Sequence, residues 1–492
     1  MKLSLSGVAG AVNQVKSIGL SLSGSYRLMS RAEKVLAIIF ILLSLGLVTY
    51  KYESHYMKST TTIPSSGGEY VENSVGDIKY INPVLAQTDL EKSLSKLLYS
   101  GLVRVEGQDK IVPDLAQNWE VSSDGMTYTF KLKKDLLFSD GVPVTSADII
   151  HTVNYIKTPE VKSSLAKTFE GVAVTAPDKD TVVFVLPKPF GPFLYSCNFG
   201  VLPAHLSPDE FQRQFTGSGP YQFVKSVKDG NRINEVSVKL NDNYHGTKPY
   251  IEKIRLKLFT DELVARTDYE TNRVSDALFG VTSGVGNKHN YSSSRRLGLI
   301  FNLRSEKLKD KALRQKIAKD EKIDQPLSLT LVTLDSPQTK QKAEELKQRF
   351  AKSNVSIDIQ ALSTTKLQEA MTAKGYDLLL YGFDFGYDRD PYKFWHSSQL
   401  DAQNYAGWSD KNSDILLEDA RMVLDITERN RRYDQFYEMV KNEALAEFYT
   451  PIEFAFEVKD RIKNVAPVVG SQVYSRFTYQ NLWYIEEARV KK

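Results

Sequence analysis

The stretch that decides the fold lies between residues 327 and 382 and reads LSLTLVTLDSPQTKQKAEELKQRFAKSNVSIDIQALSTTKLQEAMTAKGYDLLLYG. Three short apolar runs alternate with two amphipathic stretches. In chain order they lie at 327–334, 338–353, 355–362, 364–375 and 376–382. The pattern predicts a β-α-β-α-β unit, because strands joined through crossover helices of this length pair in a parallel sheet.

The next segment, GFDFGYDRDPYKFWHSSQ (382–399), begins where the third of these strands ends. Ligands of open α/β sheets bind outside the carboxyl ends of the strands, so the position favours a ligand-facing role. A calcium loop is disfavoured because Pro391 breaks its pattern, and nothing further supports a glycosidase-type acid pair. Asp384 and Asp388 remain as candidates to face a cationic group of a ligand.

The aromatic residues of this segment have two explanations that the sequence leaves open. Phe385 and Trp395 fit the packing of a core. Tyr387 and Trp395 fit the wall of a cleft, where an amphipathic ring suits a variable ligand. We keep Phe385, Tyr387 and Trp395 as candidate ligand-binding residues.

Composition limits the classes of function. Residues 1–58 carry seven Lys and Arg against two Glu, a net charge of +5, and the rest carries 57 basic and 58 acidic residues, a net charge of −1. A neutral body offers no basic surface for nucleic acid. Cys197 is the only cysteine, which excludes an internal disulfide and a multi-cysteine metal site. Nucleotide-loop, metalloprotease and serine-hydrolase motifs are absent, so we expect neither an enzyme nor a metal or other cofactor.

An apolar segment near the N-terminus indicates export. Residues 35–50 carry no charge, and a helix of this length spans about 24 Å, which flanking Lys and Tyr side chains extend toward the roughly 30 Å of a bilayer core. Arg27, Arg31 and Lys34 precede the segment, which predicts a cytoplasmic N-terminus and a body outside the cell membrane. We expect an uncleaved single-pass anchor, with a cleaved signal peptide or a buried helix as alternatives.

Several motifs, in order along the chain, carry a family resemblance. The longest is LLYSGLVRVEGQDKIVPDLAQNWEVSSDGMTYTFKLKKDLLFSDGVPVTSADI (97–149). The others are GSGPYQF (217–223), LNDNYHGTKPYIEKIRLKLF (240–259), FNLRSEKLKDKALRQKIAKD (301–320) and DRDPYKFWHSSQ (388–399). Together they resemble the family 5 extracellular solute-binding proteins, the oligopeptide- and dipeptide-binding components of ABC importers.

The resemblance implies an α/β, two-lobed fold of the type II periplasmic-binding-protein kind. An extra β-rich subdomain belongs to it, and here one N-terminal transmembrane helix precedes it. The expected division is a cytoplasmic tail (1–34), an anchor (35–50), a linker (51–68), lobe I (69–276) with its subdomain near 100–205, lobe II (277–465) and a return to lobe I (466–492).

The resemblance also implies site residues. Peptide-binding members place an Asp four residues before the proline of their D-P step, where it pairs with the peptide's α-amino group. Here that position is Tyr387. Asp384 inherits the role if three residues are inserted, and Asp388 does if the turn is re-routed. We favour Asp384 because it lies nearest the end of the strand.

Further candidates come from lobe I and from a shortened part of lobe II. Tyr221 belongs to the GSGPY segment, and the backbone of Ile78, Lys79 and Tyr80 is expected to pair with an extended peptide. The segment near 320–327 is much shorter than in the family, which affects the size of the cleft.

We therefore expect a monomeric solute-binding protein that captures peptides between its lobes. Its expected partners are the peptide, the permease subunits of an ABC transporter and the lipid bilayer. The alternatives are a non-peptide solute such as an oligosaccharide or a metal chelate, a peptide-sensing receptor, and a degenerate scaffold or an enzyme on the same framework.

Overall fold

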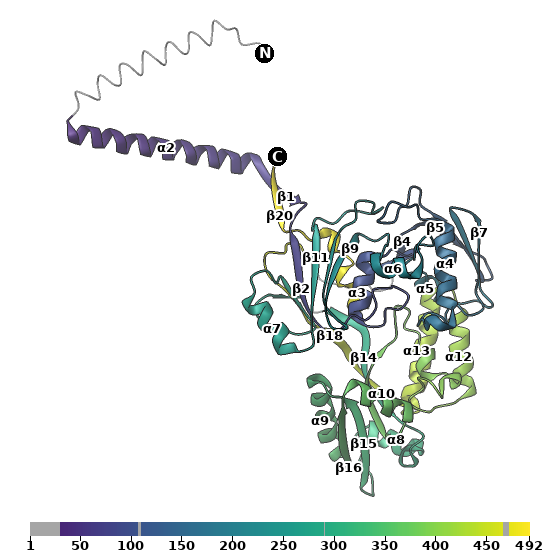
Figure 1. The fold of residues 1–492 in the computed structure, drawn as a ribbon. Helices are drawn as coiled ribbons and strands as arrows, with labels where there is room; N and C mark the ends of the chain where they lie inside the picture. The colour runs from purple at the N-terminus through teal and green to yellow at the C-terminus, as the bar shows by residue number, and fades with distance from the viewer. Residues whose placement is uncertain (1–29, 107–109, 290, 466–471) are drawn as a thin grey trace. The chain divides into compact units, whose positions relative to one another are not determined.

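The computed structural model describes residues 30–106, 110–289, 291–465 and 472–492 (Figure 1). The chain divides into two compact units, residues 1–65 with 487–492 and residues 66–486. Each unit is described by itself.

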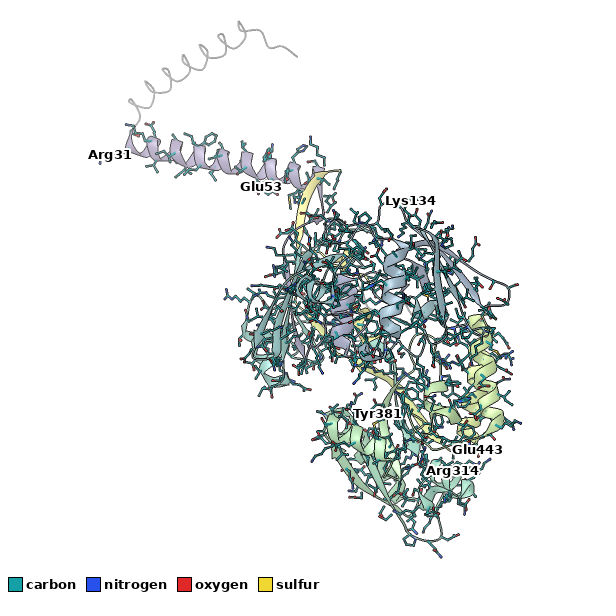
Figure 2. The ribbon with its side chains drawn as sticks, turned by 45° about the vertical axis from the view of Figure 1, so that its right-hand side comes forward. Arg31, Glu53, Lys134, Arg314, Tyr381 and Glu443 are labelled. Atoms are coloured by element: carbon teal, nitrogen blue, oxygen red, sulfur yellow. The ribbon has the colours of Figure 1, made fainter. Side chains whose placement is uncertain are left out.

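The first unit holds the long helix α2 (Arg31–Ser59), along which Figure 2 labels Arg31 and Glu53. The side chain of Ser30 caps the helix and forms a capping box with Glu33. The strand β1 (Thr60–Ser65) follows the helix and pairs with β20 (Glu486–Lys491).

Helix α2 is longer than the expected anchor at 35–50. None of its residues is buried, and it is the one helix of the described residues that is long and apolar enough to cross a membrane. The structure continues the helix through residue 59 and then forms β1, so most of the expected linker at 51–68 has regular structure. Residues 51–59 contain no Gly or Pro that would end the helix earlier.

Lobe I is built on a seven-stranded mixed sheet with the order β13-β19-β12-β2-β11-β10-β9. Strand β2 is its centre and pairs in parallel with β11 and β12, whereas β10 runs antiparallel to β9 and β11. The bounds are β2 (Glu69–Val75), β9 (Tyr221–Asp229), β10 (Arg232–Leu240), β11 (Lys253–Phe259), β12 (Ala277–Phe279), β13 (Asn287–Lys288) and β19 (Phe456–Val458), with helices α3 (Asp89–Leu98), α6 (Pro208–Gln214) and α7 (Glu262–Thr271).

Lobe I also contains a β-rich subdomain, as the sequence predicts. It has a four-stranded antiparallel sheet, β5-β6-β8-β7, and a separate pair, β3-β4. The bounds are β3 (Val103–Glu106), β4 (Lys110–Pro113), β5 (Ala116–Val121), β6 (Thr127–Leu132), β7 (Ala173–Asp178) and β8 (Thr181–Val185), with helices α4 (Ser146–Lys157) and α5 (Phe193–Ser196).

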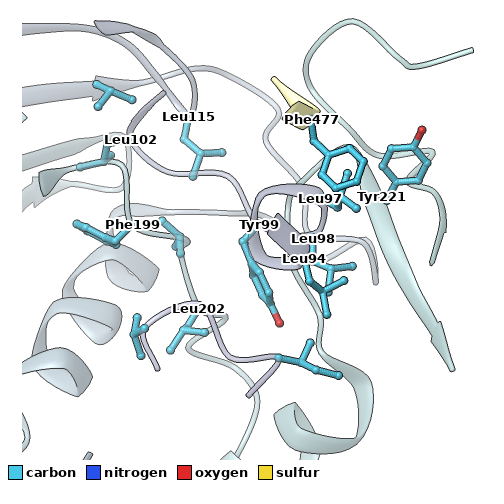
Figure 3. Packing of buried hydrophobic residues seen from close by; sticks show 14 of the residues in the cluster. Leu94, Leu97, Leu98, Tyr99, Leu102, Leu115, Phe199, Leu202, Tyr221 and Phe477 are labelled. Carbon is cyan, nitrogen blue, oxygen red and sulfur yellow. The ribbon is translucent and has the colours of Figure 1, made fainter. Parts of the chain in front are cut away.

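One continuous core joins the sheet of lobe I to its subdomain (Figure 3). Helix α3 contributes the leucines at positions 90, 94, 97 and 98, which lie on one helical face and are all buried. In Figure 3, Leu94 and Leu98 lie beside Tyr99, while Leu97 lies toward Phe477 of the C-terminal segment. Phe477 of the C-terminal segment therefore packs into the core of lobe I.

Lobe II is built on a five-stranded sheet with the order β16-β15-β17-β14-β18. Strands β15, β16 and β17 are parallel, which confirms the β-α-β-α-β prediction. The bounds are β14 (Tyr291–Phe301), β15 (Leu327–Leu334), β16 (Val355–Leu362), β17 (Leu378–Asp384) and β18 (Ala446–Phe454), with helices α8 (Lys311–Ala318), α9 (Pro337–Ala351), α10 (Thr364–Ala373), α11 (Tyr392–Trp395), α12 (Lys411–Met422) and α13 (Ile426–Asn442).

The two faces of this sheet bury different clusters. Leu378 and Leu380 of β17 pack in the cluster that includes Phe350, and Leu379 and Phe383 pack in the cluster that includes Trp395. The period of two along β17 places alternate residues on opposite faces. Both faces are covered, as a parallel sheet requires.

The strands β14 and β18 lie where the chain passes between the sheets. The lobe I sheet reaches Lys288 and resumes at Phe456, while the lobe II sheet runs from Tyr291 to Phe454. The change of sheet thus falls near 289–291 and 454–456, whereas the expected boundaries were 276 and 465. The short strands β12, β13 and β19 remain in lobe I because they pair with one another and with β2.

Residues 319–326 alone connect α8 to β15. Helix α8 is held by Arg314, whose buried guanidinium donates to the carbonyls of Leu308 (2.9 Å) and Glu443 (2.8 Å). Arg314 and Glu443 lie close together on lobe II in Figure 2.

Candidate functional site

A cavity of about 450 Å³ lies at the carboxyl ends of β15 and β17. In the sheet, β15 lies between β16 and β17. The chain continues from β15 through α9 to β16, so the connection after β15 runs away from β17 and leaves space at this edge. Tyr381, which lines the cavity, lies on the side of lobe II that faces lobe I (Figure 2). The polar lining residues are Arg295, Ser336, Gln338, Thr339, Tyr381, Asp384, Lys393, Gln403 and Tyr405.

Asp384 is the carboxylate of this cavity. Its Oδ1 accepts hydrogen bonds from the Ser294 hydroxyl and the Gly386 N–H, both at 2.9 Å, and its Oδ2 lies 3.6 Å from Nε of Arg295. Gly386 has a φ of +69°, a left-handed conformation that favours glycine. Burial raises the pKa of Asp384, but Arg295 and the Gly386 N–H lower it more, so its pKa lies below the ordinary value and the group is charged at neutral pH.

Arg295 links the cavity to lobe I. Its guanidinium donates two hydrogen bonds of 2.8 Å to the carboxylate of Asp89, in the first turn of α3. Burial lowers the pKa of Arg295, and Asp89 raises it by more. Gln472 of the C-terminal segment adds a hydrogen bond of 2.7 Å from its Nε2 to the Ser294 hydroxyl. These contacts join the two lobes beside Asp384.

Asp388 lies in a different environment, inside lobe II. Its carboxylate accepts from Arg429 at 2.6 and 2.9 Å and from the Tyr433 hydroxyl at 3.2 Å, and the side chains of Asp388 and Arg429 are only 6% and 2% exposed. Burial raises the pKa of Asp388 to about 6 against the effect of Arg429, so the pair is ionised at pH 7. Arg429 also donates to the carbonyl of Val423 at 2.6 Å. Asp388 thus holds the turn of residues 385–391 onto α13.

Tyr387 lies between the lobes, at the position where an Asp is expected. Its ring stacks on Tyr195 of α5 with centroids 6.0 Å apart and meets Tyr474 edge to face at 6.4 Å. Burial raises the pKa of Tyr387 to about 12, so its hydroxyl stays protonated. Tyr387 also lines a cavity of about 300 Å³ together with residues of lobe I such as Asp114 and Tyr244.

The other two aromatic candidates of this segment are core residues. Phe385 and Trp395 are 7% and 1% exposed and belong to the same cluster of lobe II. Phe385 packs edge to face on Phe394 and Tyr437. Both therefore pack in the core of lobe II, and Phe385 also lines a cavity of about 810 Å³ beside α13.

The candidates from lobe I are engaged within that lobe. Glu91 of α3 accepts hydrogen bonds from the backbone N–H groups of Lys79 (2.8 Å) and Tyr80 (2.9 Å), so these donors are occupied. Ile78 is buried. Tyr221 is buried as well, and its hydroxyl donates to the Ile251 carbonyl at 2.9 Å.

The sequence reasoning missed Arg295, Lys393 and Asp89. Arg295 and Arg296 form an adjacent basic pair in the middle of β14, and because side chains alternate along the strand, they line different cavities. This basic pair could have indicated cavity residues in the sequence, but the strand that carries it was not predicted. Nothing in the sequence indicates that Asp89 meets Arg295, since the two residues are separated by 206 positions.

A larger cavity of about 810 Å³ lies beside α8, α13 and β18. Arg296, Tyr437 and Phe448 contribute to its lining, and Ser294 and Tyr387 connect it to the region of Asp384. Within the described ranges, no group of three His, Cys, Asp or Glu side chains is placed to hold a metal ion.

Two lobes, with a polar cavity at the sheet edge of lobe II and an ion pair from Arg295 at that cavity to Asp89 of lobe I, define the class of the protein, a two-lobed ligand-binding protein. Residues 110–319 match the model of the bacterial extracellular solute-binding proteins, family 5 (middle part). Over these residues the chain is similar to this family.

Relatives along most of the chain agree with the family. The oligopeptide-binding protein AppA of Bacillus subtilis is 22% identical over 504 residues, which cover 84% of this chain and 92% of AppA. The substrate-binding protein CtaP of Listeria monocytogenes has a similar structure, with a TM-score of 0.75, 22% identity and coverage of 86% of this chain and 100% of CtaP.

Two further structures share the fold and hold different ligands. AppA of B. subtilis in complex with a nonapeptide has a TM-score of 0.69, 18% identity and coverage of 86% and 100%. NikZ of Campylobacter jejuni in complex with Ni(L-His) also has a TM-score of 0.69, with 21% identity and coverage of 85% and 99%. The fold alone therefore does not select the ligand.

Proposed function

We propose that this solute-binding protein captures peptides between its lobes and delivers them to an ABC importer. The observation that carries the proposal is the position of Asp384, a charged carboxylate at the edge of a 450 Å³ cavity that faces lobe I. The names of its relatives, above all the oligopeptide-binding protein, support a peptide as the ligand. The permease subunits of the importer are the second proposed partner.

Asp384 is the residue that we propose to meet the peptide's ammonium group. Asp388 is excluded from this role in our proposal because Arg429 and Tyr433 already occupy its carboxylate. Arg295 already forms an ion pair with Asp384, so the peptide's ammonium would join an existing network of charges and hydrogen bonds. A buried charge pair is favourable only in such a network.

The remaining candidates have supporting roles in the proposal. Tyr387 forms the interlobe wall next to the ammonium site. Phe385 and Trp395 support that wall from the core. Lys79 and Tyr80 can pair with an extended peptide only when Glu91 releases their N–H groups. Closure is a hinge motion at the strands β14 and β18, stabilised by a ligand that prefers the closed arrangement.

For the cell, we propose a monomer that α2 anchors in the membrane, with the body on the extracytoplasmic side. The exposed apolar side chains of α2 and the basic residues before it support this topology. Protease treatment of intact cells tests it. A body that remains protected from the protease contradicts the topology.

A thermal-shift screen tests the ligand class. Mixed tri- to octapeptides are compared with oligosaccharides and with a nickel–histidine chelate, which the NikZ structure makes the second candidate. Peptides should raise the melting temperature by mass action. A rise with the chelate or a sugar, and none with any peptide, would replace the peptide proposal with the second candidate.

A further inference from the structure

The groups around the Asp384 cavity carry an excess of positive charge. Among the residues that line the cavity, Asp384 is the carboxylate, and Arg295 and Lys393 are the cations. Two cations thus line the cavity against one carboxylate. An uncompensated charge in a cavity is costly, so a ligand that supplies the missing negative charge gains affinity there.

The arginines already satisfy the carboxylates. Arg295 holds Asp89 with two hydrogen bonds of 2.8 Å and lies 3.6 Å from Asp384. Arg421 holds Asp390 at 2.9 Å and stacks on the ring of Tyr392, 4.0 Å from its centroid.

Lys393 is the cation that remains at the cavity itself. Its side chain is exposed to the cavity, and its ammonium lies 4.6 Å from the centroid of the Phe394 ring. Among the parts of the chain that the structure describes, it forms no hydrogen bond or ion pair. Burial lowers the pKa of Lys393 below its ordinary value, although Asp384 and Asp390 act in the opposite direction. Lys92 of lobe I lies nearby, over the ring of Tyr474.

We propose that Lys393 determines specificity by binding a carboxylate of the ligand, so that the cleft prefers peptides with an acidic group in the segment that enters lobe II. This inference rests on the proposed peptide function and names the chemical class of the peptide. Gln403 and the hydroxyls of Tyr381 and Tyr405, which line the same cavity, can donate further hydrogen bonds to that carboxylate.

Two sources of the carboxylate are chemically equivalent, an acidic side chain and the C-terminus of a short peptide. A cavity of 450 Å³ accepts either. The peptide's ammonium at Asp384 and its carboxylate at Lys393 would then both bind at the same sheet edge.

The test uses alanine-based pentapeptides with Glu, Gln or Lys at each position, with free or amidated C-termini, and titrates them into the purified chain. The Glu peptide of the best position should bind about tenfold more tightly than its Gln counterpart, which corresponds to about 1.4 kcal/mol. If amidation rather than Glu→Gln removes the gain, the C-terminus is the source of the carboxylate.

Two variants locate the effect at Lys393. Lys393→Met keeps an unbranched apolar side chain beside Phe394 and should abolish the preference for the carboxylate. Lys393→Glu should reverse it in favour of the Lys peptide, which a variant that merely fails to fold cannot do. Lys366→Glu, an exposed lysine of α10 in the same lobe, is the matched control and should leave the preference unchanged.

The outcomes separate this inference from the proposed function. Equal affinity for the Glu, Gln and Lys series together with equal affinity for free and amidated C-termini, or a preference that survives in Lys393→Glu, overturns the role of Lys393 while the peptide function stands. Absence of binding by all peptides, together with binding of a sugar or metal chelate, overturns the peptide function and this inference with it.

Discussion

Replacing Asp388 by Asn should destabilise lobe II without touching the ligand site. The substitution leaves the charge of Arg429 in a place where its side chain is 2% exposed. Removing one partner of a buried ion pair costs about 3–5 kcal/mol. We expect the free energy of unfolding to decrease by about 3 kcal/mol, the lower end of this range. Two hydrogen bonds limit the loss, because the carbonyl of Val423 still accepts from Arg429 and the Asn side chain still accepts from Tyr433. For a lobe of this size that corresponds to a fall of roughly 6–12 °C in the melting temperature.

The assay is thermal unfolding followed by peptide titration at a temperature where the variant is folded. Asp434→Asn is the matched control, because Asp434 also pairs with an arginine, Arg389 at 3.3 Å, but both side chains are exposed. Its cost should stay below about 0.5 kcal/mol. If Asp388→Asn melts like the control and loses peptide affinity, Asp388 is the ligand carboxylate and the assignment to Asp384 is wrong.

Four further predictions follow from the same contacts. Asp384→Asn should weaken peptide binding about tenfold, or about 1.4 kcal/mol, with little change in melting temperature; unchanged affinity contradicts its role. Because the pKa of Asp384 is lowered, its carboxylate stays charged on acidification, and peptide affinity should decrease only at pH values below the ordinary range of Asp pKa values. The affinity of Asp384→Asn should not show this decrease. Asp89→Asn should weaken the link of the lobes at Arg295, so small-angle X-ray scattering without ligand should give a larger radius of gyration; an unchanged radius refutes the linking role. Trp395→Ala should cost about 3–5 kcal/mol of unfolding free energy, since Trp395 is 1% exposed, and a near-neutral denaturation midpoint would show that it does not support the core.

The parallel unit of lobe II could be predicted because its signals are local. The strands 327–334 and 355–362 match β15 and β16 in their bounds. The place of Asp384 at the sheet edge could be predicted as well, because it follows from the carboxyl end of a parallel strand, whatever its partners are.

The partners of the acidic residues could not be predicted. Arg429, which forms the buried ion pair with Asp388, lies 41 residues further along the chain on α13. No local pattern specifies which arginine of that helix is buried. Glu91 likewise takes the N–H groups of Lys79 and Tyr80 by reaching back from the first turn of α3. Both are tertiary contacts that decide whether a candidate is free for a ligand.

The segment 51–68 shows a different limit. Its Ser and Thr residues indicated a linker, but the preceding helix continues through residue 59 and β1 finds a partner in β20, near the other end of the chain. The strand β1 has only six residues, too few for a clear alternation of polar and apolar side chains. Its partner lies near the other end of the chain, so no local pattern predicts the pairing.

The most direct test of the central claim is a crystal structure with a peptide from the thermal-shift screen. We predict peptide density in the 450 Å³ cavity, with its ammonium about 3 Å from Asp384 and a carboxylate at the same distance from Lys393. Density confined to the 810 Å³ cavity beside α8 and α13, or an ammonium on Asp388 in place of Arg429, would contradict the account.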